Sequence, residues 1–303
     1  MTNDLPNFWE QINQELPEDD NIIDLKRDLK RASDSMEEDE ARFMVDAYYM
    51  MQEQRKASSN QLRSMDAEPH DVLQWLVYNS NRMENQIKSA LDVYTDGNKL
   101  SQWSKSVFGI NRVLSAGLLA HIDIDKAKSP ASIWRFAGLD PTVSWNKGEK
   151  RPWNAELKTL CWKIGDSFVK TKNKPKDFYG HLYQDRRDFE DAENEAGNYA
   201  EEAEKQLTQK NYGKNTEAYK IYSTGKLPPN HMFSRSKRWT VKLFLSHYWQ
   251  VGKDIEGTLP PDWKPWVISI GGHQDIIDPP NWHPFGEWGV FHPEDIQMDE
   301  AAD

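Results

Sequence analysis

The sequence contains a single cysteine, Cys161, and this scarcity excludes two classes of stabilising site. One thiol cannot form an intramolecular disulfide, and it cannot supply a zinc site built from cysteines. The chain also lacks an uninterrupted run of 18 apolar residues, so no segment has the pattern of a membrane span. A basic and then apolar N-terminal segment, as in a signal peptide, is missing as well. We therefore expect a cytoplasmic protein with no membrane partner.

Several catalytic and nucleotide-binding motifs are also absent from the sequence. There is no Walker loop, no dinucleotide-binding glycine pattern and no nucleophile-elbow serine motif. The histidines gather late in the chain, but no pair has the i, i+4 spacing of helical metal ligands. These histidines are His231, His247, His273, His283 and His292. We therefore predict no metal site and no cofactor, and Mg²⁺ would enter only with a nuclease site that the sequence does not reveal.

Aromatic residues, by contrast, are plentiful. The 303 residues include 13 Trp, 11 Tyr and 11 Phe, although 29% of the chain is charged. Such bulky side chains can bury a substantial core even when the fraction of aliphatic residues is low. We therefore expect a folded protein and not a disordered one.

The net charge of −11 is unevenly distributed along the chain. Residues 1–40 hold 13 acidic and 4 basic residues, and residues 287–303 hold 6 acidic residues and no basic one. Between these ends, residues 126–174 carry 11 Lys and Arg against 4 Asp and Glu. A basic segment of this kind favours an anionic partner such as nucleic acid. The acidic ends are either solvated tails or shields for the basic segment.

Apolar residues recur at helical spacing across most of residues 21–250, which predicts a mainly α-helical fold. A break is expected at residues 57–60, and a short β-like run at residues 266–270. A long charged helix is expected at residues 176–211, although Gly197 weakens it locally, and its surface is a candidate for homodimer formation. The expected parts are a helical N-terminal segment with an acidic start (1–100), a helix-hairpin-helix-like domain (101–175), a long charged helix (176–211), a basic helix with an irregular Trp- and Pro-rich C-terminal region (212–286), and an acidic tail (287–303).

Residues 108–120 have the pattern of a helix, a tight turn and a second helix. In a DNA-binding helix-hairpin-helix the turn is Gly-apolar-Gly, and N–H groups at the start of the second helix hold a phosphate. Gly109 and Ile110 match this turn, and Asn111 replaces the second glycine as a residue that tolerates left-handed backbone. Arg112 adds positive charge. Because any pair of helices can be joined through a glycine, a purely structural turn is the alternative.

A second motif follows the hairpin, and after it come a basic loop and an amphipathic helix with Asn154 as the expected N-cap. The second motif is Phe136-Ala137-Gly138-Leu139-Asp140-Pro141. In order and spacing, residues 105–165 resemble the C-terminal domain of the DEDD-type insertion-sequence transposases. That group includes the Piv-like invertases and the bridge-RNA-guided recombinases. The chain as a whole resembles phage and mobile-element proteins that carry this domain, and the resemblance implies DNA as the partner.

Two features of that family are not matched. The family has an N-terminal RuvC-like domain that begins with a strand carrying a metal-binding Asp, whereas residues 1–100 have a helical pattern throughout. The family also uses a serine shortly after its Gly-Leu-x-Pro motif. Ser144 is the only serine available and lies one or two positions early, so it is either a nucleophile or an ordinary loop hydroxyl. A separate nuclease or recombinase is therefore a candidate partner.

Two clusters of basic residues are candidate contacts for nucleic acid. In the first, cations can pair with phosphates while indoles stack on exposed bases. Its residues are Trp145, Lys147, Lys150, Arg151 and Trp153. The second cluster lies on a helix expected at about 233–252 and comprises Arg235, Lys237, Arg238 and Lys242. Arg235, Arg238 and Lys242 share one face of that helix. The alternatives are that the tryptophans belong to the core and that the cations are simply solvated.

Three functions are compatible with these patterns. The first is a DNA-binding protein that contacts the DNA backbone or branched DNA. The second is an active serine-dependent transposase, recombinase or nuclease, and the third is a structural or interaction protein without a DNA role. Cys161 shares an apolar helical face with Leu157 and Ile164, so we expect it to be a small buried hydrophobe in any of them.

Overall fold

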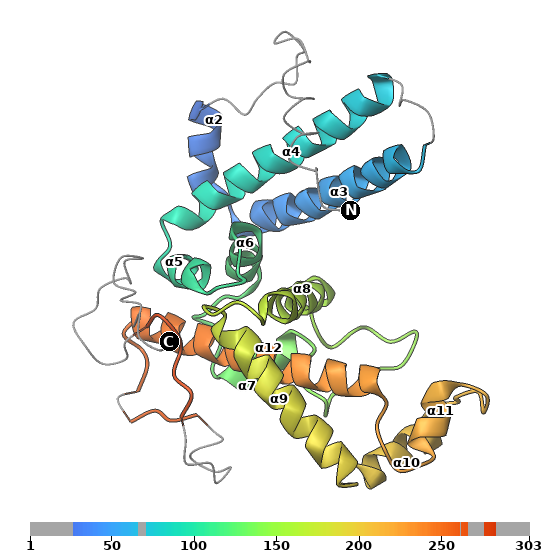
Figure 1. Ribbon diagram of the computed structural model, residues 1–303. Helices are drawn as coiled ribbons and strands as arrows, with labels where there is room; N and C mark the ends of the chain where they lie inside the picture. Colours follow the sequence, from blue (N-terminus) through green and yellow to red (C-terminus); the bar gives the residue numbers. More distant parts are fainter. Residues whose placement is uncertain (1–26, 66–70, 261, 266–275, 283–303) are drawn as a thin grey trace, which may run out of the picture. The chain divides into compact units, whose positions relative to one another are not determined.

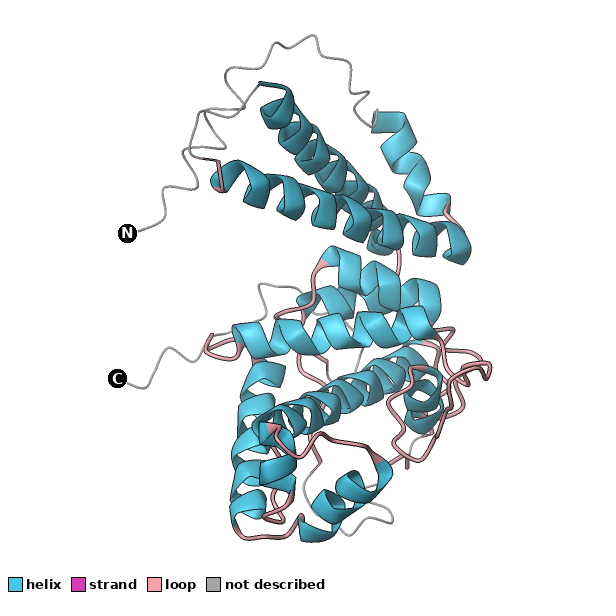
Figure 2. Ribbon diagram, turned by 90° about the vertical axis from the view of Figure 1, so that its right-hand side faces the viewer, coloured by secondary structure: helices cyan, strands magenta, loops and turns pink. Residues whose placement is uncertain are grey.

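The computed structural model describes residues 27–65, 71–260, 262–265 and 276–282. Within these ranges the chain forms eleven α-helices and one short 3-10 helix, and it forms no strand (Figures 1 and 2). The predicted mainly α-helical fold is therefore confirmed. The chain divides into two compact units between Gly97 and Asn98, and each unit is described by itself.

The N-terminal unit is built on a pair of long helices that pack along each other (Figure 1). Its elements are α2 (Arg27–Ala32), η1 (Ser33–Ser35), α3 (Glu38–Arg63) and α4 (Asp71–Asp96). The Glu37 and Glu40 side chains form a capping box at the start of α3. Val45 and Tyr48 of α3 and Val77 of α4 are buried. These residues carry the helical periodicity that the sequence displayed.

The break expected at residues 57–60 is wrong, because α3 continues through this segment to Arg63. Ser and Asn cost a helix interior only a few tenths of a kcal/mol more than most residues, far less than Pro. Ser59 and Leu62 are both buried, and they extend the buried face of α3 by one more turn. Packing along this face therefore outweighs the weak local preference for a turn.

The described part of the C-terminal unit contains eight helices, of which α12 is the longest. Its elements are α5 (Lys99–Ser106), α6 (Arg112–His121), α7 (Pro130–Phe136), α8 (Ala155–Thr171), α9 (Phe178–Glu195), α10 (Ala200–Gln209), α11 (Glu217–Tyr222) and α12 (Pro229–Ile255). Helices α5, α7, α8 and α9 all contact α12 (Figure 1). A helix with neighbours on so many sides must be apolar on most of its surface, as α12 is along its second half.

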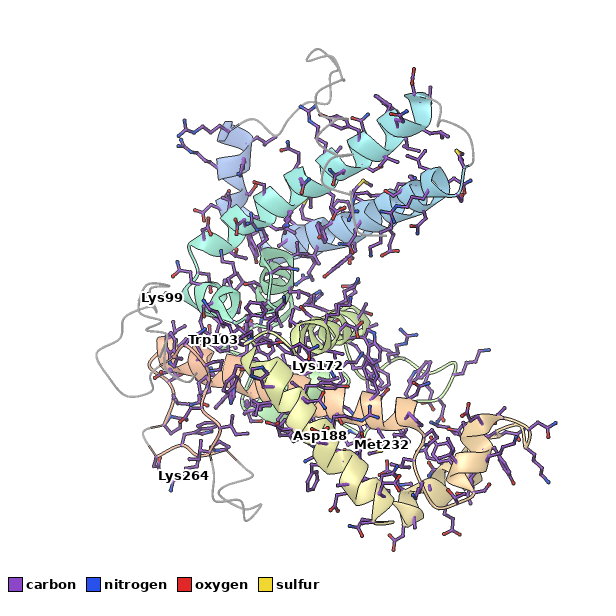
Figure 3. All side chains as sticks on the ribbon, in the orientation of Figure 1. Lys99, Trp103, Lys172, Asp188, Met232 and Lys264 are labelled. Carbon is purple, nitrogen blue, oxygen red and sulfur yellow. The ribbon has the colours of Figure 1, made fainter. Side chains whose placement is uncertain are left out.

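The core of this unit contains a cluster of aromatic side chains. Trp103, labelled in Figure 3, stacks on Phe244 of α12 with 6.0 Å between ring centroids. Phe168 of α8 stacks on Tyr179 of α9 at 4.9 Å, and both are fully buried. Ring pairs at these separations stabilise a core beyond the area that they bury. The abundance of aromatic residues in the sequence is thus accounted for by packing.

Residues 176–211 do not form the single long helix that we expected. Helix α9 ends at Glu195 and α10 begins at Ala200, and between them Gly197 has a left-handed φ of +83°. Glycine adopts this conformation at little cost, so it reverses the chain here. Ala203 of α10 then packs with Tyr222 and Met232 in a small core of its own. Part of the face proposed for a homodimer is therefore covered within the chain, and the homodimer stays a prediction.

The described part of the C-terminal region is tied to the helices by its tryptophans and their neighbours. Trp103 donates its indole N–H to the carbonyl of Pro280 at 2.8 Å, and Trp282 donates to Asp254 at 2.8 Å. This arrangement agrees with the irregular Trp-rich region that the sequence predicted. The β-like run at 266–270, the acidic start before residue 27 and the acidic tail at 287–303 lie outside the described residues.

Candidate nucleic-acid interface

The turn between α5 and α6 has the backbone expected at its glycine. Gly109 has a φ of +92°, and Ile110 is buried. The turn packs against α8: the Ser167 hydroxyl donates to the Gly109 carbonyl at 2.6 Å, and a Cβ on Gly109 would lie 3.2 Å from Phe168. Glycine is therefore required at position 109 because the backbone of the turn lies close to α8. Packing within the unit explains both Gly109 and Ile110.

Asn111 differs from the expectation. It has a φ of −90° and a ψ of 171°, which is extended and not left-handed backbone. Its side-chain oxygen caps α6 by accepting from the N–H groups of Val113 and Leu114, both at 3.0 Å. These are the N–H groups that a hairpin would offer to a phosphate, and an N-cap satisfies them within the chain. Arg112 is exposed beside them. A DNA contact at Gly109, Ile110, Asn111 and Arg112 stays a prediction.

The basic loop between α7 and α8 folds back on itself. Trp145 donates its indole N–H to the Glu149 carbonyl at 2.8 Å, and the ring of Trp153 lies edge-on to Trp145 with centroids 6.2 Å apart. Gly138 has a φ of +64°, and a Cβ there would lie 2.7 Å from the Trp153 ring, so only glycine fits beneath this indole. Asn154 caps α8 at the end of the loop, as predicted.

Both loop tryptophans remain half-buried, and each carries a cation over its ring. The Arg151 guanidinium lies 5.3 Å from the Trp145 centroid, and the Lys158 ammonium lies 4.1 Å from the Trp153 centroid. Such cation–π contacts orient the cations while leaving them accessible. The alternative that these two tryptophans belong to the core is therefore wrong.

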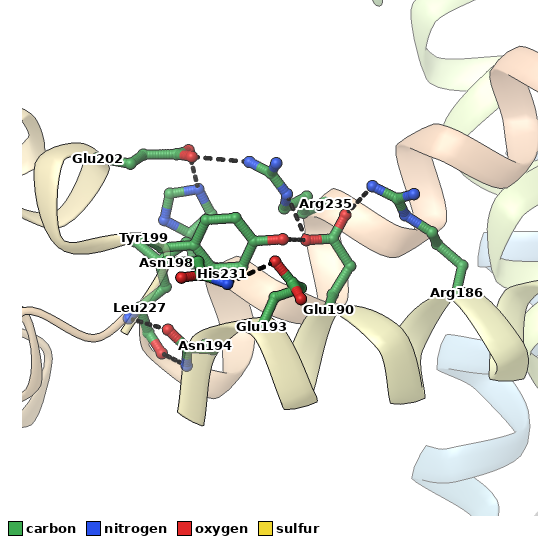
Figure 4. Close-up of polar contacts among 10 residues, drawn as sticks. All are labelled: Arg186, Glu190, Glu193, Asn194, Asn198, Tyr199, Glu202, Leu227, His231 and Arg235. Atoms are coloured by element: carbon green, nitrogen blue, oxygen red, sulfur yellow. Dashed lines mark hydrogen bonds and ion pairs between the residues drawn. The ribbon is translucent and has the colours of Figure 1, made fainter. Parts of the chain in front are cut away.

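The second basic cluster, on α12, is divided among three environments. Arg235 donates to Glu190 at 2.6 Å and to Glu202 at 2.7 Å, as Figure 4 shows. Lys242 lies over the Trp134 ring of α7 at 4.2 Å. Only Arg238 faces the basic loop. The phosphate-binding track expected along Arg235, Arg238 and Lys242 is thus not one surface, because Arg235 is held by two carboxylates of this chain.

Arg238 and the loop meet at a pocket of about 570 Å³ between the loop, the first half of α8 and the middle of α12. We call it the indole–cation pocket. Three tryptophans and four cations line it, together with small and apolar residues. The seven defining residues are Trp145, Trp153, Trp162, Arg151, Lys158, Lys237 and Arg238. Within the described chain, no Asp or Glu lines this pocket.

The cations of the indole–cation pocket differ in their partners. Lys237 is almost fully buried and donates to Asp166 at 2.8 Å, so its charge is balanced within the protein. Over the residues that the structure describes, Arg151, Lys158 and Arg238 have no ion-pair partner. Three positive charges therefore converge in the pocket, and none of them forms an ion pair with a carboxylate of the described chain; Glu202 and Glu190 act on Arg238 only from beyond ion-pair distance.

This crowding affects the ionisation of the pocket. The pKa of Lys158 is lowered, first by burial and then by the charges of Arg238 and Arg151. The pKa of Arg238 is lowered as well, by burial and by the neighbouring Arg235. Both shifts mean that the pocket disfavours further positive charge. A bound anion would reverse this effect and stabilise the cations.

The sequence did not predict Lys158 and Trp162 as site residues, and it placed Lys237 in the second basic cluster but not on the face expected to bind phosphate. Lys158 and Trp162 are four positions apart on α8 and share its exposed face, which a helical projection could have revealed. Lys237 occupies the space that Gly165 leaves: a Cβ on Gly165 would lie 2.6 Å from the Lys237 Cγ. No local pattern signals this last contact. Lys147 and Lys150, by contrast, are exposed on the loop and do not line the pocket.

Ser144 is exposed on the loop. In the described part of the chain, no hydrogen bond joins its hydroxyl to a histidine or a carboxylate that could activate it. A nucleophilic Ser144 stays a prediction. Cys161 is 1% exposed on the inner wall of the pocket, and burial raises the pKa of its thiol to about 12. Its predicted burial is confirmed.

The described residues contain no group of three or more His, Cys, Asp and Glu side chains placed to hold a metal ion. His273, His283, His292 and Asp275 lie outside those residues. None of the described helices combines the length and the hydropathy needed to cross a membrane.

Comparison with known proteins finds no match to any protein family, curated protein or solved structure. The resemblance to DEDD-type transposases therefore depends on the motifs within residues 105–165 alone.

Proposed function

We propose that this chain is a DNA-binding protein of the mobile-element type that recognises DNA with unpaired bases through the indole–cation pocket. The observation that carries this proposal is the lining of the pocket by three tryptophans and four cations without a carboxylate. Cations that lack internal partners suit phosphates, and indoles suit bases released from a helix. The similarity of residues 105–165 to a transposase DNA-handling domain points to the same partner.

The size of the pocket favours unpaired over duplex DNA. A volume of about 570 Å³ is that of a small-molecule site and is far too small for a base-paired segment. A single base can enter such a pocket once it has left the stack, as in proteins that extrude a nucleotide. The duplex parts of a branched substrate would then contact exposed loop cations such as Lys147 and Lys150 through their phosphates.

Catalysis is assigned to a separate nuclease or recombinase in this proposal. Strand transfer by Ser144 would require a general base, and no described side chain of that kind is hydrogen bonded to the serine. The RuvC-like sheet of the transposase family would require strands, and residues 27–65 and 71–97 contain none. Binding without chemistry is therefore the function that these residues support best.

The proposal is tested by measuring affinity for single-stranded, branched and duplex DNA at one salt concentration. We expect tighter binding to the first two, and Trp153→Ala should weaken single-strand binding by about 1–3 kcal/mol while affecting duplex binding less. Trp75→Ala, at an exposed tryptophan of the N-terminal unit, is the matched control. If Trp153→Ala lowers the melting temperature and leaves every affinity unchanged, the pocket is structural and the proposal is wrong.

A further inference from the structure

The indole–cation pocket contains two kinds of recognition element in one partly open volume. Trp145 and Trp153 present aromatic surface from the loop, and Arg238 presents a guanidinium from α12. Arg238 is half-buried and has no ion-pair partner in the described chain. A partly buried guanidinium without a carboxylate is unusual, because removing such a charge from water is unfavourable unless a partner compensates it.

The charges that line the pocket around Arg238 favour an anionic ligand, since Glu202 and Glu190 act on this arginine only from beyond ion-pair distance. Its neighbours in the lining, Lys158 and Lys237, are cations, and the one nearby carboxylate that contacts them, Asp166, accepts from Lys237. A phosphate suits this position, since a guanidinium offers it two parallel N–H donors and the ammonium of Lys158 adds charge. The hydroxyl-bearing residues Thr159 and Ser234 also line the pocket.

We propose, as a deepening of the function given above, that the indole–cation pocket binds one phosphate-bearing nucleotide, with its phosphate at Arg238 and Lys158 and its base against Trp145 and Trp153. A volume of about 570 Å³ accommodates one such ligand together with water. The nucleotide has two possible sources, the phosphorylated terminal nucleotide of a DNA strand and a free nucleotide. Both present the same aromatic base and phosphate to these residues.

The first experiment measures the binding of small ligands to the full chain by calorimetry. The ligands are deoxyadenosine 5′-monophosphate, deoxyadenosine and inorganic phosphate. We expect the nucleotide to bind at least ten-fold more tightly than either fragment, because a charge-assisted contact and a stacked base each contribute to it. Equal binding of the nucleotide and the nucleoside would overturn the role of the phosphate, and equal binding of the nucleotide and phosphate would overturn the role of the base.

The second experiment assigns this preference to the proposed residues. Arg238→Gln should weaken nucleotide binding about ten-fold or more and remove the advantage of the nucleotide over the nucleoside. Arg135→Gln, at an exposed arginine of α7 that does not line the pocket, should leave it unchanged. Lys158→Gln changes an exposed helical residue that should not affect folding, and it should produce a smaller loss in the same direction. Nucleotide affinity unchanged in both pocket variants would refute the proposal.

The third experiment separates the two sources with single-stranded oligonucleotides that carry either a 5′-phosphate or a 5′-hydroxyl. A preference for the phosphorylated strand that Arg238→Gln abolishes identifies a strand end as the ligand. Binding of the free nucleotide without binding of any oligonucleotide identifies a free nucleotide, and it contradicts the DNA-binding function while supporting this inference. Binding of oligonucleotides that neither Arg238→Gln nor the 5′-phosphate affects supports the DNA-binding function and contradicts this inference.

Discussion

Two arginines three residues apart on α12 lie in different surroundings. Arg235 contacts the carboxylates of Glu190 and Glu202, whereas Arg238 forms no ion pair in the described chain and lines a pocket with other cations, indoles and small or apolar residues. The difference comes from the neighbouring elements, since α9 and α10 bring acids to Arg235, and the 137–154 loop and α8 bring cations to Arg238. The comparison shows that the same residue type fixes the fold at one position and is available to a ligand at the other.

The ion pairs around Arg235 should contribute more to the free energy of unfolding than the cations of the pocket do. Glu190 is fully buried and accepts from Arg186, Tyr199 and Arg235 (Figure 4). Glu190→Ala would leave the partly buried guanidinium of Arg186 without a carboxylate and would leave Arg235 with Glu202 alone, and we expect the free energy of unfolding to fall by about 3–5 kcal/mol. Chemical denaturation followed by circular dichroism measures this change.

The control for Glu190 is Glu195, another residue of α9, which forms an exposed ion pair. Glu195 pairs with Lys226 at the surface, so Glu195→Ala should cost less than about 1 kcal/mol. A loss of similar size in the two variants would contradict the assignment of Glu190 as the residue that joins α9, α10 and α12.

A buried titratable group farther along α12 is kept in its neutral form by burial. His247 contacts the Tyr179 hydroxyl at 2.7 Å and the Ile277 carbonyl at 2.8 Å, and burial lowers the pKa of its imidazole to about 4. Between this pKa and the unfolded value of about 6.5, the unfolded chain binds the extra proton. Stability is therefore lost as pH falls from about 6.5 towards 4.

We expect this histidine to lower the free energy of unfolding by about 2 kcal/mol between pH 7 and pH 5. Denaturation at the two pH values measures the loss, and His247→Gln provides the comparison because glutamine does not titrate in this range. The variant should show a pH dependence that is smaller by the same amount. A pH dependence identical to that of the unaltered protein would show that His247 is not responsible.

Local features of this fold could be predicted from the sequence, and long-range ones could not. The Asn154 cap, the positive φ of Gly109 and the burial of Cys161 depend on residues within one or two helical turns. The sequence indicated only that the helix would be less stable near Gly197, and not that α9 would end there. A glycine inside a helical pattern does not reveal whether packing will preserve the helix.

The candidate site was predicted only in part for the same reason. Trp145, Arg151, Trp153 and Arg238 were identified from basic and aromatic composition, but nothing in the sequence brings α12 to the loop. The carboxylates that hold Arg235 come from positions 190 and 202, too far along the chain for a helical pattern to indicate them. Only the tertiary structure shows that Arg235 is held by ion pairs and that Arg238 is not.

In the proposed function, the cations of the indole–cation pocket that lack an ion pair, and not basic residues in general, hold nucleic acid. The most direct test is the salt dependence of single-strand binding in a matched pair of loop variants, Arg151→Ala inside the pocket and Lys147→Ala outside it. Three phosphate contacts predict a slope of about −2 in a plot of log affinity against log salt. Arg151→Ala should reduce its magnitude by about 0.7, and Lys147→Ala should not change it. Equal slopes in the two variants would contradict the claim.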